Sequence, residues 1–208
     1  TYDRSVHVFR PEWLSTMAGI QFIRFMDWGQ TNHSPLQTWS ERPTDTTATC
    51  TLKLPRLKYP LLQSGIGVPY EFMIDVCNQL NADPWVCIPH AVDNDYVTQL
   101  STLFRDGLNS NLRLMLEYTN EMWNPQFEQQ SYRSDTLFVK YTITDYNQAY
   151  ATRACELFSF ADTVFALEPH RLVRILAGQE GNPSTGTGII HADVSVATDV
   201  VLTRSEEH

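Results

Sequence analysis

Apolar and polar positions along the chain fall into two alternating patterns, one typical of strands and one typical of helices. Dense apolar runs bounded by proline, glycine or polar residues favour buried strands, because a strand covered on both faces has no polar side. The runs that predict strands cover residues 20–26, 84–90, 112–119 and 171–177, with a candidate fifth strand at 199–203.

Between these runs, apolar residues recur at the three- and four-residue spacing of an amphipathic helix. Residues 29–68 and 181–198 show neither pattern and are predicted to be loops. Proline at the first turn, glycine after the last and aspartate or asparagine as N-cap are the usual helix boundaries. These signals predict a helix from Pro11 to Gly19, a second from Pro69, a third from Asp93 or Asn94 to Gly107, and a long helix over about 145–167.

Alternating strands and helices predict a parallel sheet, because a crossover helix returns the chain to the same end of the sheet. A complete (β/α)8 barrel, or TIM barrel, needs about 250 residues. This chain has 208 residues and offers four or five βα units. We therefore expect a single α/β domain over residues 1–208, built as an open sheet, an abbreviated barrel or a section of a larger one.

Composition narrows the classes of partner. The chain carries 15 Lys and Arg against 24 Asp and Glu, a net charge of −9, which argues against nucleic-acid binding. No apolar run approaches the roughly 20 residues of a membrane helix, so no membrane partner is expected. The first residues lack the features of a signal peptide, which leaves a cytosolic protein and a processed secreted protein both open. The four cysteines form no C-x-x-C pair and are expected to be small buried apolar residues.

Polar residues follow the predicted strands at their carboxyl ends, where parallel α/β proteins bind ligands. Any single polar strand end can simply meet solvent, but four strands share this feature. The residues at these ends are Asp27 and Trp28, His90, Asn120 and Glu121, and Gln179.

Four segments resemble the retaining glycoside hydrolases of clan A, and most resemble a branch labelled cellulose-binding or glycosyl-hydrolase-like. The most specific of them is Asn-Glu at a strand end, followed by Met-Trp-Asn and preceded by the Pro-His strand. The likeness covers about residues 10–180. It is carried by residues 23–28 (IRFMDW), 67–71 (GVPYE), 82–90 (ADPWVCIPH) and 117–124 (EYTNEMWN).

The resemblance implies a (β/α)8 barrel and assigns roles to several residues. Glu121 would be the general acid/base, and Asn120 would hold the sugar hydroxyl next to the reacting carbon. Arg24 would lie near the nucleophile, and His90 would line the same pocket. Two features depart from the family: the first strand unit is missing before residue 1, and the nucleophile of the seventh strand has no counterpart.

Retaining hydrolysis needs two carboxyl groups about 5–5.5 Å apart, and inverting hydrolysis needs roughly 6.5–9.5 Å. The apolar neighbours of Glu121 favour a raised pKa, which would suit a proton donor. Glu117 is about 13 Å further back along the strand and is expected to point into the interior, bonded to a neighbour. Glu180, Glu206 and Glu207 are candidate partners, although each is better explained as a solvated surface residue.

Tryptophan side chains at strand ends favour a sugar ligand, because pyranose rings stack their C–H faces on flat aromatic surfaces. Trp28, Trp39 and Trp123 occupy such positions, with Asp27 beside the first of them. For Trp39, a sugar platform and an anchor for its long loop are both open. Trp13 and Trp85 lie within a predicted helix and a strand and are expected in the core.

The sequence gives little support for a metal site or a cofactor site. His90, Asp93 and Asp95 are close in sequence, but the two aspartates are better explained by the dipole at a helix N-terminus. Gly65 and Gly67 lack the third glycine of a dinucleotide fingerprint, and no serine-hydrolase elbow occurs. We expect no metal and no cofactor.

Three functional hypotheses follow. The first is a glycoside hydrolase that cleaves a β-linked poly- or oligosaccharide by general acid/base catalysis with Glu121. The second is a non-catalytic glycan-binding or structural module that lacks the nucleophile. The third is a fragment whose remaining strands lie elsewhere. A carbohydrate partner suits a secreted, extracellular or cell-surface protein, and an incomplete barrel could close by self-association.

Overall fold

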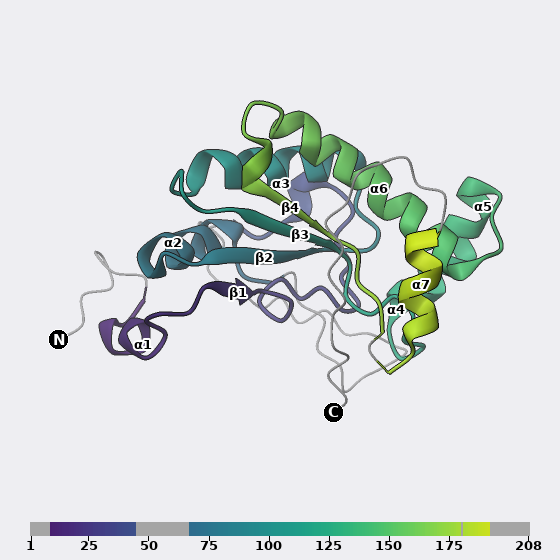
Figure 1. Ribbon diagram of the computed structural model, residues 1–208, viewed down its shortest axis with the longest axis horizontal. Coiled ribbons are helices and arrows are strands. Elements are labelled where there is room, and N and C mark those ends of the chain that lie inside the picture. The colour runs from purple at the N-terminus through teal and green to yellow at the C-terminus, as the bar shows by residue number, and fades with distance from the viewer. Residues whose placement is uncertain (1–8, 45–66, 180, 192–208) are drawn as a thin grey trace.

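The computed structural model describes residues 9–44, 67–179 and 181–191, and its centre is a sheet of four parallel strands. The strands lie side by side in chain order, and their arrows point the same way (Figure 1). In register, Arg24 lies opposite Trp85, and Cys87 lies opposite Glu117. The strands are β1 (Phe22–Arg24), β2 (Asp83–Ile88), β3 (Leu114–Tyr118) and β4 (Leu172–Ile175).

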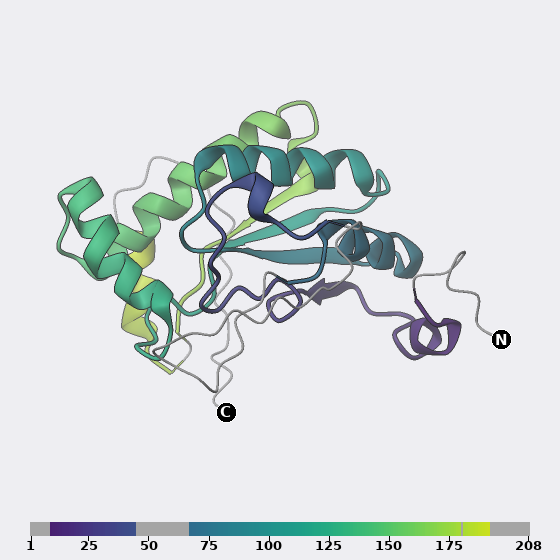
Figure 2. The same cartoon turned by 180° about the vertical axis from the view of Figure 1, so that it is seen from behind.

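Three helices connect these strands, and α3 and α6 pack side by side over one face of the sheet (Figures 1 and 2). The shorter helices α4, α5 and α7 lie toward the carboxyl ends of the strands, and α1 lies at the opposite end, near the start of β1 (Figure 1). The connecting helices are α2 (Tyr70–Leu80), α3 (Asn94–Gly107) and α6 (Tyr146–Val164). The others are α1 (Pro11–Thr16), α4 (Glu128–Tyr132), α5 (Phe138–Tyr141), α7 (Pro183–His191), the 3-10 turns Trp39–Glu41 and Pro169–Arg171, and a π-turn at Arg133–Leu137.

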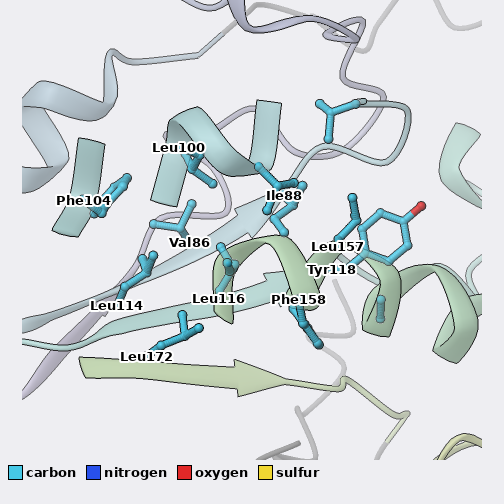
Figure 3. Close-up of a cluster of buried hydrophobic side chains, with 14 of the residues drawn as sticks. Val86, Ile88, Leu100, Phe104, Leu114, Leu116, Tyr118, Leu157, Phe158 and Leu172 are labelled. Atoms are coloured by element: carbon cyan, nitrogen blue, oxygen red, sulfur yellow. The ribbon is translucent and has the colours of Figure 1, made fainter. Parts of the chain in front are cut away.

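The hydrophobic core lies between the sheet and these helices. Alternate residues of β2, β3 and β4 point toward α3 and α6, as a strand's two-residue period requires (Figure 3). The side chains labelled there are all buried: Val86, Ile88, Leu114, Leu116, Tyr118 and Leu172 from the strands, and Leu100, Phe104, Leu157 and Phe158 from the helices.

The expected α/β class with a parallel sheet is confirmed. Over the described residues the sheet is open, and β1 and β4 form its edges. The predicted helix starts are also confirmed. The carboxylate of Asp93 accepts a hydrogen bond from Tyr96 N at 2.8 Å, and that of Asp145 accepts one from Gln148 N at 2.8 Å.

The prediction that residues 181–198 form a loop is wrong for the part that the structure describes, where α7 lies. Two features explain the helix: Pro183 occupies its first position, and α7 packs against α6. A β-carbon at Gly188 would lie 2.3 Å from the Asn147 side-chain nitrogen, so glycine permits the close contact. Glycine and serine weaken the helical pattern in the sequence. The candidate strand at 199–203 lies outside the described residues.

Candidate functional site

An ion pair with a fully buried carboxylate lies on the face of the sheet opposite the helices. Glu117 of β3 has 0% of its surface exposed, and Arg24 of β1 reaches it across β2. Arg24 Nη2 donates to both carboxylate oxygens at 3.0 Å, and Nε donates to Oε2 at 3.2 Å. This forked geometry is the one that guanidinium and carboxylate groups fit best. The expectation that Glu117 points inward and bonds to a neighbour is confirmed.

Two residues of β2 complete the surroundings of Glu117. Trp85 Nε1 donates to Glu117 Oε2 at 2.7 Å, and Cys87 Sγ lies 3.3 Å from the same oxygen. Burial raises the pKa of Glu117 above its ordinary value, and the guanidinium of Arg24 and these donors oppose that rise. Burial also raises the pKa of the Cys87 thiol. Trp85 and Cys87 are buried as expected, and both serve the carboxylate as hydrogen-bond donors.

A chain of amide side chains extends from Arg24 to the carboxyl end of β3. Arg24 Nη2 donates to Asn120 Oδ1 at 3.1 Å, and Asn120 Nδ2 donates to Asn32 Oδ1 at 3.0 Å. Gln129 of α4 donates through Nε2 to Asn32 Oδ1 at 2.6 Å and to the Asn120 carbonyl at 2.9 Å. Side chains from three separate segments therefore hold Asn120: Arg24 and Asn32 bond to its side chain, and Gln129 bonds to its carbonyl.

Glu121 begins a tight turn directly after this anchored residue. Its φ of +40° lies in the left-handed region, which costs a residue with a β-carbon roughly 1–2 kcal/mol. Asn124 Nδ2 donates to Glu121 Oε2 at 2.8 Å, and Asn124 N donates to the Glu121 carbonyl at 2.9 Å. Glu121 is half-buried, while Met122 beside it is buried in the core. Strain of this kind is commonly kept at functional sites.

The other strand-end residues lie in different surroundings. His90 is buried, its carbonyl accepts a hydrogen bond from Tyr118 Oη at 2.8 Å, and its ring meets the Tyr132 ring edge-on at 5.2 Å between centroids. Asp27 is exposed, and its carbonyl accepts the Gln30 side-chain amide at 2.9 Å. Both residues follow their strands by two or three positions, and the hydrogen bonds that link Arg24, Asn120, Asn32 and Gln129 are made without their side chains.

The tryptophans predicted as sugar platforms separate into three situations. Trp28 packs in an aromatic cluster, with ring centroids 6.4 Å from Trp13 and 5.3 Å from Phe25. Trp39 stacks on Tyr70 at 6.1 Å and carries the Arg42 guanidinium over its ring at 4.3 Å.

Trp39 also meets the Tyr96 ring of α3 edge-on at 5.2 Å. These contacts favour the anchor role for Trp39, because its partners belong to its own loop and to the helices α2 and α3. Trp123 is half-buried in the turn that follows Glu121. Of the three, Trp123 is the one that the chain places directly beside the candidate acid.

Glu117, the carboxylate nearest to Glu121 in sequence, does not supply the second carboxylate. Glu117 is fully buried and bonded to Arg24, Trp85 and Cys87, so it cannot attack a substrate. Glu180, Glu206 and Glu207 lie outside the described residues. Within the described ranges no group of three or more His, Cys, Asp or Glu side chains could hold a metal ion. Asp93 caps α3, as its position in the sequence predicted.

Asn32 and Gln129 are the members of this site that sequence reasoning missed. Asn32 lies in the long segment after β1, and Gln129 lies in a stretch with no clear helical period. A lone amide in such a segment carries no sequence signal, because amides are common on solvated surfaces. Only the fold brings both to the end of β3, where each meets Asn120.

A scan against protein-family models and searches of the curated proteins and of the solved structures found no match to this chain. No helix in the described ranges is long and apolar enough to span a bilayer.

Proposed function

We propose that this chain is a glycoside hydrolase-like protein that acts on a β-linked poly- or oligosaccharide, with Glu121 as the general acid/base. The observation that carries the proposal is the anchored turn at the end of β3. Asn120 is fixed by Arg24, Asn32 and Gln129, whereas the carboxylate of Glu121 is half-buried and held only within its own turn. A rigid frame around one accessible carboxyl group suits proton transfer at a fixed point.

The surrounding residues would then bind and orient the sugar. Asn120 and Arg24 present polar groups at the same edge, and Trp123 supplies an aromatic surface next to Glu121. His90 and Asp27 lie at the ends of neighbouring strands. The in-order parallel sheet, with α3 and α6 on one face, supports a section of a (β/α)8 barrel as the parent architecture.

In this proposal the second carboxylate comes from a residue outside the described ranges or from another chain. Hydrolysis with two carboxyl groups requires no metal and no organic cofactor. A polysaccharide substrate would also suit an extracellular or cell-surface location. The sugar and its linkage depend on the shapes of the loops at this edge.

The test is hydrolysis of unactivated β-linked oligosaccharides by the wild type, by Glu121→Gln and by Glu12→Gln. Glu12 is exposed on α1, so its variant controls for the loss of one carboxylate. We expect cleavage to fall by about 10²-fold or more in Glu121→Gln, because an unactivated leaving group needs the proton, and to persist in Glu12→Gln. No cleavage by the wild type, or equal cleavage by both variants, would overturn the proposal.

A second function, glycan binding without cleavage, is favoured by one observation. The buried carboxylate nearest to Glu121 in sequence, Glu117, is committed to Arg24 and unavailable to a substrate. Calorimetric titration with the same oligosaccharides separates the two functions. Binding without cleavage, retained in Glu121→Gln, would establish a binding module, because the acid is then not needed.

A further inference from the structure

Gln129 is the most fully bonded amide side chain of the site, with three hydrogen bonds to the residues around it. It has 0% of its surface exposed. Its Nε2 donates to Asn32 Oδ1 and to the Asn120 carbonyl, and its Oε1 accepts from His33 N at 3.3 Å. Both hydrogens of the amide are therefore engaged, and so is its oxygen.

The direction of every hydrogen bond in this chain of amides is fixed from both ends. At one end, the Asn120 carbonyl can only accept and His33 N can only donate, which orients the Gln129 amide. At the other end, the guanidinium of Arg24 can only donate, which orients Asn120 Oδ1 toward it.

Asn32 Oδ1 lies between the two ends and accepts from both Asn120 and Gln129. A side chain of the same shape as Gln129 but without its donors would therefore place an oxygen against two other oxygens.

The bond from Gln129 to the Asn120 carbonyl acts on the backbone immediately before Glu121. Glu121 has a φ of +40°, a conformation that persists only where its surroundings impose it. The side chain of Asn120 is held by Arg24 and Asn32, and its carbonyl is held by Gln129. No other described side chain bonds to this carbonyl.

We infer that Gln129 is a positioning residue that holds the Asn120–Glu121 peptide group and so directs the Glu121 carboxyl group toward the leaving oxygen of the substrate. The inference rests on the proposed role of Glu121. Gln129 acts through Asn120 and Asn32 and does not touch the substrate. By fixing the backbone of this strained turn, it preorganises the Glu121 carboxyl group as a proton donor.

The test compares Gln129→Glu with Gln130→Glu, the same change at the next position of α4. Gln130 is half-buried, and no described hydrogen bond involves its side chain. Two substrate types are used: an unactivated oligosaccharide and an aryl glycoside with an acidic phenol, which leaves without a proton. We expect Gln129→Glu to lose about tenfold or more in kcat on the first with little change in KM, and to lose far less on the second.

The pH profile supplies a further readout that general loosening of the fold would not produce. In Gln129→Glu the introduced carboxyl group can donate to the Asn120 carbonyl only while it is protonated. Cleavage of the unactivated substrate should therefore recover, relative to the wild type, as the pH falls.

A measurement without substrate separates failure of this inference from failure of the proposed function. In 15N NMR spectra, the backbone amide of Glu121 and the side-chain amide of Asn120 should shift in Gln129→Glu and stay in place in Gln130→Glu. If Gln129→Glu does not fold, Gln129→Asn shortens the side chain without adding charge and should produce the same shifts.

Unchanged resonances, or equal losses on both substrate types, would overturn the positioning role. If the resonances change in Gln129→Glu but the wild type cleaves nothing, the role in proton donation is overturned and only the structural contact remains.

Discussion

The two faces of the sheet differ in chemistry although neighbouring residues of the same strand build them. Leu116 points toward α6 and joins an apolar core, while Glu117, the next residue, points away and binds Arg24, Trp85 and Cys87. Both residues have 0% of their surface exposed. On one face, burial removes apolar surface from water; on the other, burial is tolerated only because every charge has a partner.

This contrast indicates what each face is built for. Apolar packing on the helix side stabilises the fold and tolerates similar residues of similar volume. A buried ion pair contributes little net stability, because desolvation offsets the attraction between its charges. Its geometry, however, is specific, and the Arg24 guanidinium that the pair holds in place also donates a hydrogen bond to Asn120. The polar face therefore carries the arrangement of the candidate site, and the apolar face carries the stability.

The largest expected effect comes from breaking the ion pair on one side only. Glu117→Ala would leave the Arg24 guanidinium, Trp85 Nε1 and Cys87 Sγ without their acceptor, and we expect it to lower the free energy of unfolding by about 3–5 kcal/mol. Urea denaturation measures this loss. The matched variant on the other face is Leu116→Ala, which removes buried volume and should cost about 2–5 kcal/mol.

The two variants should differ at the site. In Leu116→Ala the NMR resonances of the Asn120 side-chain amide should stay in place, because Arg24 keeps its partner. In Glu117→Ala they should move, because the guanidinium that orients Asn120 is released. Equal displacement in both variants would show that the two faces are coupled and would contradict the division between them.

The helix side could be predicted from the sequence in far more detail than the polar face. The repeated apolar positions of α3 and α6, and the caps Asp93 and Asp145, are local signals that survive in the fold. Strand existence was also predictable, although β1 is shorter than its apolar run, because only Phe22–Arg24 pairs with β2. Residues 125–144 were assigned to no helix or strand from the sequence, and in the structure the π-turn among them packs against α4, α5 and α6.

The site was predictable only in part. Glu121 and Asn120 follow from the strand-end position, and the inward direction of Glu117 follows from the two-residue period. Its pairing with Arg24, 93 positions earlier, depends on the sheet order, which places the first and third strands on either side of the second. The amides Asn32 and Gln129 come from irregular segments, where only three-dimensional contacts show their role.

A smaller expected effect is the pH dependence of the stability that carboxylates on the two sides of the sheet contribute. Glu156 of α6 lies among Tyr141, Lys140, Arg153 and Asn94 on the helix side. Burial alone would raise its pKa, but the hydrogen bonds from Tyr141, Lys140 and Arg153 outweigh it and lower the pKa to about 2. Because the pKa falls on folding, this group adds stability above its ordinary value of 4.5, and the contribution is lost as the pH falls toward about 2.

Glu156→Gln should therefore lower the free energy of unfolding by about 1–3 kcal/mol near neutral pH, discounted for the partly exposed side chain. The difference from the wild type should shrink below pH 4.5, as denaturation at several pH values would measure. Glu117 should show the opposite sign, because burial raises its pKa and its contribution is lost as the pH rises through the raised value. The same pH trend for both carboxylates would contradict this contrast.

The smallest expected change in stability comes from removing both charges together, in Arg24→Met combined with Glu117→Leu. Apolar residues of similar volume avoid the desolvation cost of the pair, so the free energy of unfolding should stay within about 1 kcal/mol of the wild type, even though Trp85 Nε1 loses its acceptor. Urea denaturation and oligosaccharide binding are measured on the same preparation. Binding and cleavage should be lost, because Asn120 Oδ1 loses the donor that orients it. A double variant as unstable as Glu117→Ala would assign the ion pair to stability and not to the site.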